Sequence, residues 1–169
     1  MVTQHARVAE DGNGPRTTYE DIEIGKILGE MDWVVTDDMI DAQCHMDRDF
    51  DTWYSLESPW QGRIAPPQIS YRPPRWLLSR TYNIRGLFCG WEMENIKPIK
   101  PGVTLHIQAS VADKYIKNDR EFVTYQAAAT DPEGALVFRT KRTHVLDVVD
   151  RNAPRAGTGV DSGIKAEKI

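Results

Sequence analysis

The stretch that decides the fold is a run in which apolar and polar residues alternate, Val103-Thr104-Leu105-His106-Ile107-Gln108-Ala109-Ser110-Val111. Alternation with a period of two is typical of a β-strand that has one buried face and one solvated face. Three more strands are predicted around it, over residues 87–96, 122–129 and 136–149. Pro132-Glu133-Gly134 supplies the turn between the last two. The C-terminal half of the chain therefore predicts an antiparallel sheet.

The N-terminal half predicts one further strand, over residues 27–36, and then a short helix. Thr36 is suited to cap that helix, because its hydroxyl can accept a hydrogen bond from a free N–H of the first turn. Asp37 and Asp38 follow in that turn, where the helix dipole favours negative charge. The apolar stripe of this helix is expected to consist of Met39, Ile40, Gln43 and Met46.

A longer helix is predicted to begin near Ala65, after a polar and aromatic stretch over residues 47–63 that reads mostly as loop. Pro73 and Pro74 fall inside this helix and should bend or interrupt it, because proline lacks the N–H that a helix needs. One antiparallel sheet with a long helix on one face is an α+β architecture.

Composition limits the classes of function. The chain has 169 residues and a net charge of −4, with acidic and basic residues mixed, which does not suit a nucleic-acid partner. No apolar run is long enough for a membrane helix. The two cysteines, Cys44 and Cys89, do not have the spacing of metal ligands, and both are expected to be buried. We expect a cytoplasmic protein with a folded domain over 18–150 and flexible tails over 1–17 and 151–169.

Three segments give the chain a resemblance to a known family. They are Tyr19-Glu20-Asp21-Ile22-Glu23-Ile24-Gly25-Lys26, the stretch Lys97-Pro98-Ile99-Lys100-Pro101-Gly102-Val103-Thr104-Leu105, and the segment from Asp49 to Pro67. In this order they resemble the MaoC-like branch of the hotdog fold, which includes (R)-specific enoyl-CoA hydratases and related dehydratases. The resemblance implies a curved antiparallel sheet wrapped around a long central helix.

The family's catalytic pattern, Asp-x-Asn-Pro-x-His followed by His-Gly at the helix start, is altered in this chain. Asp49 matches the catalytic Asp, Tyr54 stands where the His is usual, and Pro66-Pro67 replaces the His-Gly pair. The resemblance implies Asp49 as the base. Tyrosine, with a pKa near 10, is suited to donate a proton rather than accept one. Because proline has no N–H, the oxyanion role would pass to the N–H of Gln68 or to the Tyr54 hydroxyl.

The same comparison implies a substrate site for an apolar acyl group, with Trp53, Trp60, Pro67, Gln68 and Arg72 around it. The substrate could carry coenzyme A, whose phosphates would need cations such as Arg72, and no metal or separate cofactor is expected.

Structural interpretations compete with these roles. Asp49 could cap a turn or pair with Arg48 or Arg63, and the aromatic residues of the loop could simply pack. His45 is expected to face solvent, and Arg72, Arg75 and Arg80 to extend along the long helix to solvent. His106 and His144 occupy polar-alternation positions on strands and are expected to be structural or exposed.

Three functions remain open from the sequence. The first is a hydro-lyase acting β to a carbonyl. The second is a non-catalytic, acyl-binding partner subunit of a heteromeric dehydratase, since such subunits often begin the helix with the Ala-Pro-Pro found at residues 65–67. The third is a hotdog thioesterase, which only the fold supports. In each case we expect a homodimer or a larger assembly, because one curved sheet around one helix leaves apolar surface uncovered.

Overall fold

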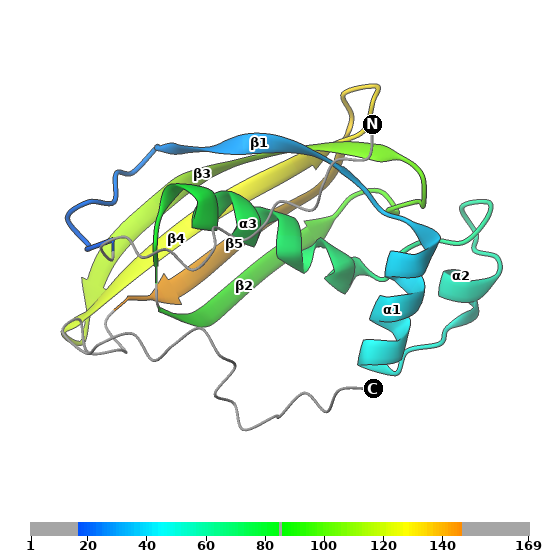
Figure 1. Ribbon diagram of the computed structural model, residues 1–169, viewed down its shortest axis with the longest axis horizontal. Helices are drawn as coiled ribbons and strands as arrows, with labels where there is room; N and C mark the ends of the chain where they lie inside the picture. The colour runs from blue at the N-terminus through cyan, green and yellow to red at the C-terminus, as the bar shows by residue number, and fades with distance from the viewer. Residues whose placement is uncertain (1–16, 85, 147–169) are drawn as a thin grey trace, which may run out of the picture.

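The computed structural model describes residues 17–84 and 86–146, and these form a single antiparallel sheet with one helix across its face and two others beyond one end (Figure 1). The strands are β1 (Ile27–Val34), β2 (Leu87–Asn95), β3 (Thr104–Lys117), β4 (Arg120–Thr130) and β5 (Leu136–Val145). The helices are α1 (Asp37–Asp47), α2 (Thr52–Ser55) and α3 (Arg72–Thr81), and a 3₁₀ helix, η1 (Pro67–Tyr71), leads directly into α3. The strand order β1-β3-β4-β5-β2, with all neighbours antiparallel, confirms the predicted α+β hotdog architecture.

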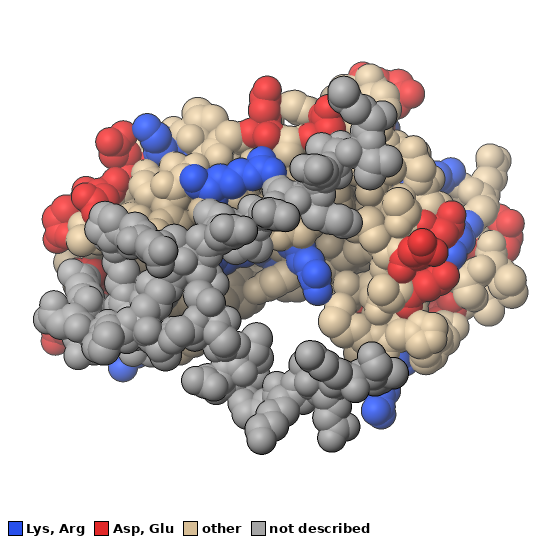
Figure 2. Space-filling view, in the orientation of Figure 1, with Lys and Arg blue, Asp and Glu red and all other residues tan. Residues whose placement is uncertain are grey.

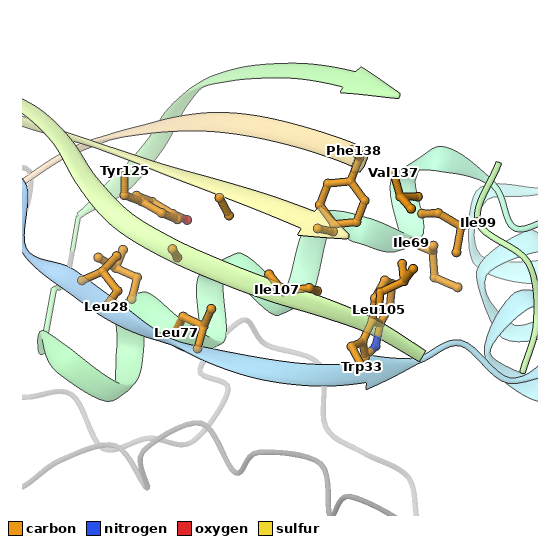
Figure 3. Close-up of a cluster of buried hydrophobic side chains, with 14 of the residues drawn as sticks. Leu28, Trp33, Ile69, Leu77, Ile99, Leu105, Ile107, Tyr125, Val137 and Phe138 are labelled. Atoms are coloured by element: carbon orange, nitrogen blue, oxygen red, sulfur yellow. The ribbon is translucent and has the colours of Figure 1, made fainter. Parts of the chain in front are cut away.

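The inner face of the sheet packs on α3, and the core lies between them (Figure 3). Leu77 and Leu78 of α3 are completely buried against alternate residues of β3 such as Leu105 and Ile107. The alternation of apolar and polar residues in β3 therefore places the apolar ones inside and the polar ones outside, as predicted.

Tight connections join the three central strands. Asn118 and Asp119, between β3 and β4, both have positive φ (51° and 58°), the backbone that two-residue hairpin turns require. The β4–β5 turn is closed by a bond from the Asp131 N–H to the Ala135 carbonyl (2.9 Å), with Gly134 at φ 81°. β3 is longer than predicted, because its pairing with β4 continues past a bulge between Val111 and Asp113.

The central helix has two parts, five residues of η1 and ten of α3. Pro73 and Pro74 lie in the first turn of α3, where a missing N–H costs nothing. The predicted interruption is thus a change from 3₁₀ to α geometry just before this pair.

Other sequence expectations were wrong in detail. Met46 is 60% exposed, and Cys44 takes its place on the buried side of α1 with Ile40. Cys89 is exposed because β2 is an edge strand. A short helix, α2, lies within the predicted loop.

The predicted tails, 1–17 and 151–169, and the end of the last predicted strand lie almost entirely outside the described residues. None of the helices in the described part of the chain is long and apolar enough to cross a lipid bilayer.

Candidate active site

The end of α1 fixes the position of Asp49. α1 begins as predicted, with the Thr36 hydroxyl accepting a hydrogen bond from the Met39 N–H (3.3 Å). It ends at Arg48, whose left-handed backbone (φ 54°) turns the chain away from the helix axis. The Asp49 N–H then donates to the Cys44 carbonyl (3.0 Å), so Asp49 is held at the C-terminal end of the helix.

Asp49 also caps a turn. Its Oδ1 accepts a hydrogen bond from the Asp51 N–H (3.3 Å), and Asp51 in turn caps α2 through the Trp53 N–H (2.9 Å). The alternative in which Asp49 caps a turn is therefore observed for one carboxylate oxygen. Within the described residues the other oxygen makes no hydrogen bond, so the half-buried carboxylate keeps a free acceptor.

Tyr54 is half-buried at the edge of the core, one turn into α2. Burial raises the pKa of the Tyr54 phenol, and the negative charges of Asp49 and Asp51 raise it further. At neutral pH Tyr54 is protonated and can donate a proton but cannot act as a base.

Arg63 holds the segment in place, a role that was not predicted from the sequence. Its Nε donates to the Tyr54 carbonyl (2.8 Å), while Nη1 and Nη2 contact the carboxylates of Asp37 (3.1 Å) and Asp41 (2.6 Å). The alternative that paired Arg63 with Asp49 is wrong, because both ends of the guanidinium are taken by α1. The spacing of two aspartates four residues apart on one helix face was the available signal. Figure 2 shows acidic side chains gathered over α1.

The structure brings two of the predicted substrate-binding residues together. Trp53 and Trp60 meet edge to face with their ring centroids 5.3 Å apart, and each is about two-fifths exposed (42% and 43%). Trp60 also lines a hollow of about 740 Å³, together with Lys97 and Lys100. Asp49 and Tyr54 are not among the residues that line this hollow. The exposed rings are free to cover an apolar ligand.

The remaining predicted residues lie along the start of the central helix. Pro67 and Gln68 are exposed in the first turn of η1, and Arg72 is exposed where α3 begins. The Gln68 N–H, in a first turn, has no acceptor inside the helix. No hydrogen bond within the described part of the chain joins Pro67, Gln68 or Arg72 to Asp49 or Tyr54.

The histidines divide into two kinds. His45 is exposed as expected, with Nδ1 2.9 Å from the Asp41 carbonyl oxygen. His106 lies on the outer face with Nδ1 3.0 Å from Asp32 Oδ1, and this hydrogen bond, despite opposing burial, raises its pKa. His144, expected to be structural or exposed, is buried on the inner face.

Among residues 17–84 and 86–146, no group of three His, Cys, Asp or Glu side chains is arranged to hold a metal ion. The candidate groups are thus the Asp49 carboxylate, the protonated Tyr54 phenol, two exposed indole rings and the Gln68 N–H.

Comparison with known proteins gives the fold its class. No protein-family model matches the sequence, and no curated protein matches it. Solved structures do match. An (R)-hydratase of Pseudomonas aeruginosa, PhaJ1, shows 16% identity and a TM-score of 0.63 over 76% of this chain and 84% of its own. A MaoC-like dehydratase of Rhodospirillum rubrum shows 23% identity and a TM-score of 0.60 over 75% of this chain and 94% of its own.

A third match is a heteromeric protein. It is the HadBC (3R)-hydroxyacyl-ACP dehydratase complex of Mycobacterium tuberculosis, with 13% identity and a TM-score of 0.66 over 72% of this chain and 96% of the matched chain. At these identities the similarity establishes the architecture alone. The chain is a hotdog-fold protein, and it shares that fold with hydratases and dehydratases.

Proposed function

We propose that this chain is a MaoC-like hydro-lyase that adds or removes water across the carbon β to a carbonyl. The observation that supports the proposal is that Tyr54, whose pKa is raised by burial and then by the negative charge of Asp49, stays protonated near a carboxylate with a free oxygen. A carboxylate base near a protonated phenol provides the two groups that a dehydration needs.

In the dehydration direction, Asp49 removes the proton from the α-carbon and Tyr54 donates its proton to the leaving β-hydroxyl, so that water departs. Hydration is the reverse of this step: the Tyr54 phenolate that dehydration leaves accepts a proton from the attacking water, and the protonated Asp49 returns its proton to the α-carbon. The Gln68 N–H is the candidate donor to the carbonyl oxygen as negative charge develops on it, since Pro67 has none.

The proposed substrate is an acyl thioester such as a CoA ester, or a related apolar carbonyl compound. Trp53, Trp60 and Pro67 would contact its apolar part, and the exposed guanidinium of Arg72 would meet a phosphate of the carrier. No cofactor other than a carrier within the substrate is required.

The test is turnover of a panel of 2-enoyl-CoA and 3-hydroxyacyl-CoA esters by the purified chain. Asp49→Asn and Tyr54→Phe should each lower kcat by about 10²- to 10⁴-fold, the usual contribution of a positioned acid or base, with the fold retained. Asp38→Asn is the matched control, an exposed aspartate in the first turn of α1, and should keep full activity. Full activity in the Asp49→Asn, Tyr54→Phe double variant would contradict the proposal.

A second candidate function is a non-catalytic partner subunit. The observation that favours it is the Pro66-Pro67 start of η1, which removes a backbone donor from the first turn of the central helix. The similarity of fold to a chain of the HadBC complex is in line with it. Absence of turnover by the chain alone, restored by a second hotdog chain from the same genome, would favour this function over the first.

We further propose that the chain assembles into a homodimer or a larger oligomer. Leu87, Phe88, Trp91 and Ile96 lie on or next to β2, an edge strand, and each is 37% exposed or more. A row of unpaired backbone groups beside exposed apolar side chains is typical of a strand that pairs with another chain. A monomer by multi-angle light scattering would contradict this.

A further inference from the structure

Unpaired polar atoms are concentrated at one place inside the fold. In the described residues, six buried side-chain nitrogen or oxygen atoms have no hydrogen-bond partner. Five of the six belong to three neighbouring residues: Nε, Nη1 and Nη2 of Arg142, the hydroxyl of Tyr125 and Nδ1 of His144. Buried polar groups in proteins are almost always paired, so a cluster of five indicates a missing partner.

The sheet register brings the three side chains together. Tyr125 of β4 pairs directly with Arg142 of β5, and His144 follows two residues later on the same inner face. The rings of Tyr125 and His144 lie 5.6 Å apart, and Figure 3 shows Tyr125 directed into the space that faces α3. Each of the three residues is at most 3% exposed.

Aromatic rings surround the guanidinium of Arg142. It lies 4.0 Å from the ring centroid of Tyr71, at the end of η1, and 5.6 and 5.4 Å from those of Phe88 and Trp91 of β2. Each of the three rings is also 36–38% exposed, so they separate the cation from solvent. Cation–π contacts compensate a buried charge in part, but they leave its N–H groups without acceptors.

The electrostatics of the cluster favour an anion. Arginine stays protonated even when buried, so Arg142 cannot relieve the cost of burial by losing its charge. Burial raises the pKa of Tyr125 and lowers that of His144, while the positive charges of Arg142 and of Arg75 of α3 oppose the first shift and add to the second. Arg142 also approaches the Tyr125 hydroxyl, although the two groups do not meet in hydrogen-bond geometry. No carboxylate is among the charged groups that shift the pKa of Tyr125 or of His144.

We propose that this cluster is a binding site for the carboxylate of a small, flat organic acid. The planar fork of Arg142 would hold both carboxylate oxygens, as guanidinium groups commonly do. The Tyr125 hydroxyl and the N–H of a neutral His144 would complete the donors. Tyr71, Phe88 and Trp91 would contact the apolar body of the acid, and the Tyr71 ring would move aside to admit it. The site stands independently of the hydro-lyase chemistry proposed above.

Binding of simple acids to the full chain tests this proposal. Benzoate should bind by calorimetry and raise Tm, while benzamide, which has the same shape without the charge, should not. Arg142→Met should weaken benzoate binding by about 30-fold or more, because removal of one member of a buried charge pair commonly costs at least that factor. The matched control is Arg139→Met on the same strand but the opposite, exposed face, and it should bind benzoate normally.

A second experiment needs no variant. Crystals of the wild-type chain soaked in 4-bromobenzoate should show the anomalous bromine signal among Tyr71, Phe88 and Trp91, with the carboxylate at Arg142. Bromine elsewhere, or benzoate binding that Arg142→Met leaves unchanged, would overturn the proposal. It would also be overturned if no acid bound and Arg142→Met instead dissociated the oligomer, since Arg142 would then pair with a carboxylate of a second copy. Binding of inorganic phosphate in preference to benzoate would assign the cluster to a different anion and likewise overturn it.

Discussion

The buried His144 should make the stability of this protein fall as the solution becomes acidic. Desolvation is the main cause, and the charges of Arg75 and Arg142 add to it, so the pKa of His144 lies at about 4 rather than 6.5. Because the folded state holds the ring neutral while the unfolded state protonates it, unfolding takes up a proton between these two values. The free energy of unfolding should therefore decrease as the pH falls below about 6.5 and level off below about 4.

The size of the effect follows from the two pKa values. A difference of about 2.5 in pKa corresponds to about 3 kcal/mol in total, of which about 2 kcal/mol should be lost by about pH 5. The assay is urea unfolding at about pH 7.5 and about pH 5, for the wild type and for His144→Phe, which keeps a ring beside Phe88 and Tyr125. The variant should lose about 2 kcal/mol less than the wild type between the two pH values.

His106→Gln is the matched control on the same sheet. The pKa of His106 is raised, so its contribution to stability is present at acidic pH and is lost as the pH rises through that pKa. Removing His106 should therefore not reduce the acid-induced loss but slightly enlarge it. If His144→Phe lost as much stability as the wild type, or if the His144 ring signals titrated near pH 6.5 by NMR, the reasoning would be refuted.

The remaining predictions concern local geometry and can be checked by the same urea assay. Arg63→Ala should lower the free energy of unfolding by about 2–4 kcal/mol, since it removes a charged hydrogen bond to a carbonyl and two ion pairs, whereas the exposed Arg72→Ala should cost less than about 0.5 kcal/mol. Gly86→Ala should cost about 1–3 kcal/mol, because an added Cβ would lie 1.9 Å from the Val145 carbonyl oxygen. Thr36→Ala, which removes the cap of α1, should cost about 1 kcal/mol, and an unchanged midpoint would show that the cap does not contribute.

The architecture could be predicted because strong local patterns agree with it. The alternation in β3, the Thr36 cap and the turn at Gly134 each specify one local structure, and the tertiary fold preserves all three. α2 was missed because four residues are too few to show a helical period. Cys89 was placed inside because a sequence does not reveal which strand of a sheet will lie at an edge.

The cluster of Tyr125, Arg142 and His144 could not be predicted, and the reason lies in β5. Its inner positions hold Thr140, Arg142 and His144, while its outer positions hold Arg139 and Lys141. Both sets are polar, so alternation alone does not say which faces the core. Only the register with β4 decides it. The segment from Asp49 to Tyr54 was recognised by resemblance, but the bonds that anchor it depend on Arg63, which comes from the other end of the loop.

The strand order also determines the sequence in which the sheet can assemble. β3, β4 and β5 are joined by tight turns, so their pairing closes only short loops, whereas β1 must find β3 and β2 must find β5 across much longer stretches of chain. We expect the central meander to form early and the two outer strands to dock later. In amide hydrogen exchange, β4 should then be the slowest strand to exchange and β2 among the fastest. β2, whose Phe88 and Trp91 cover Arg142, would therefore be among the strands that open most readily.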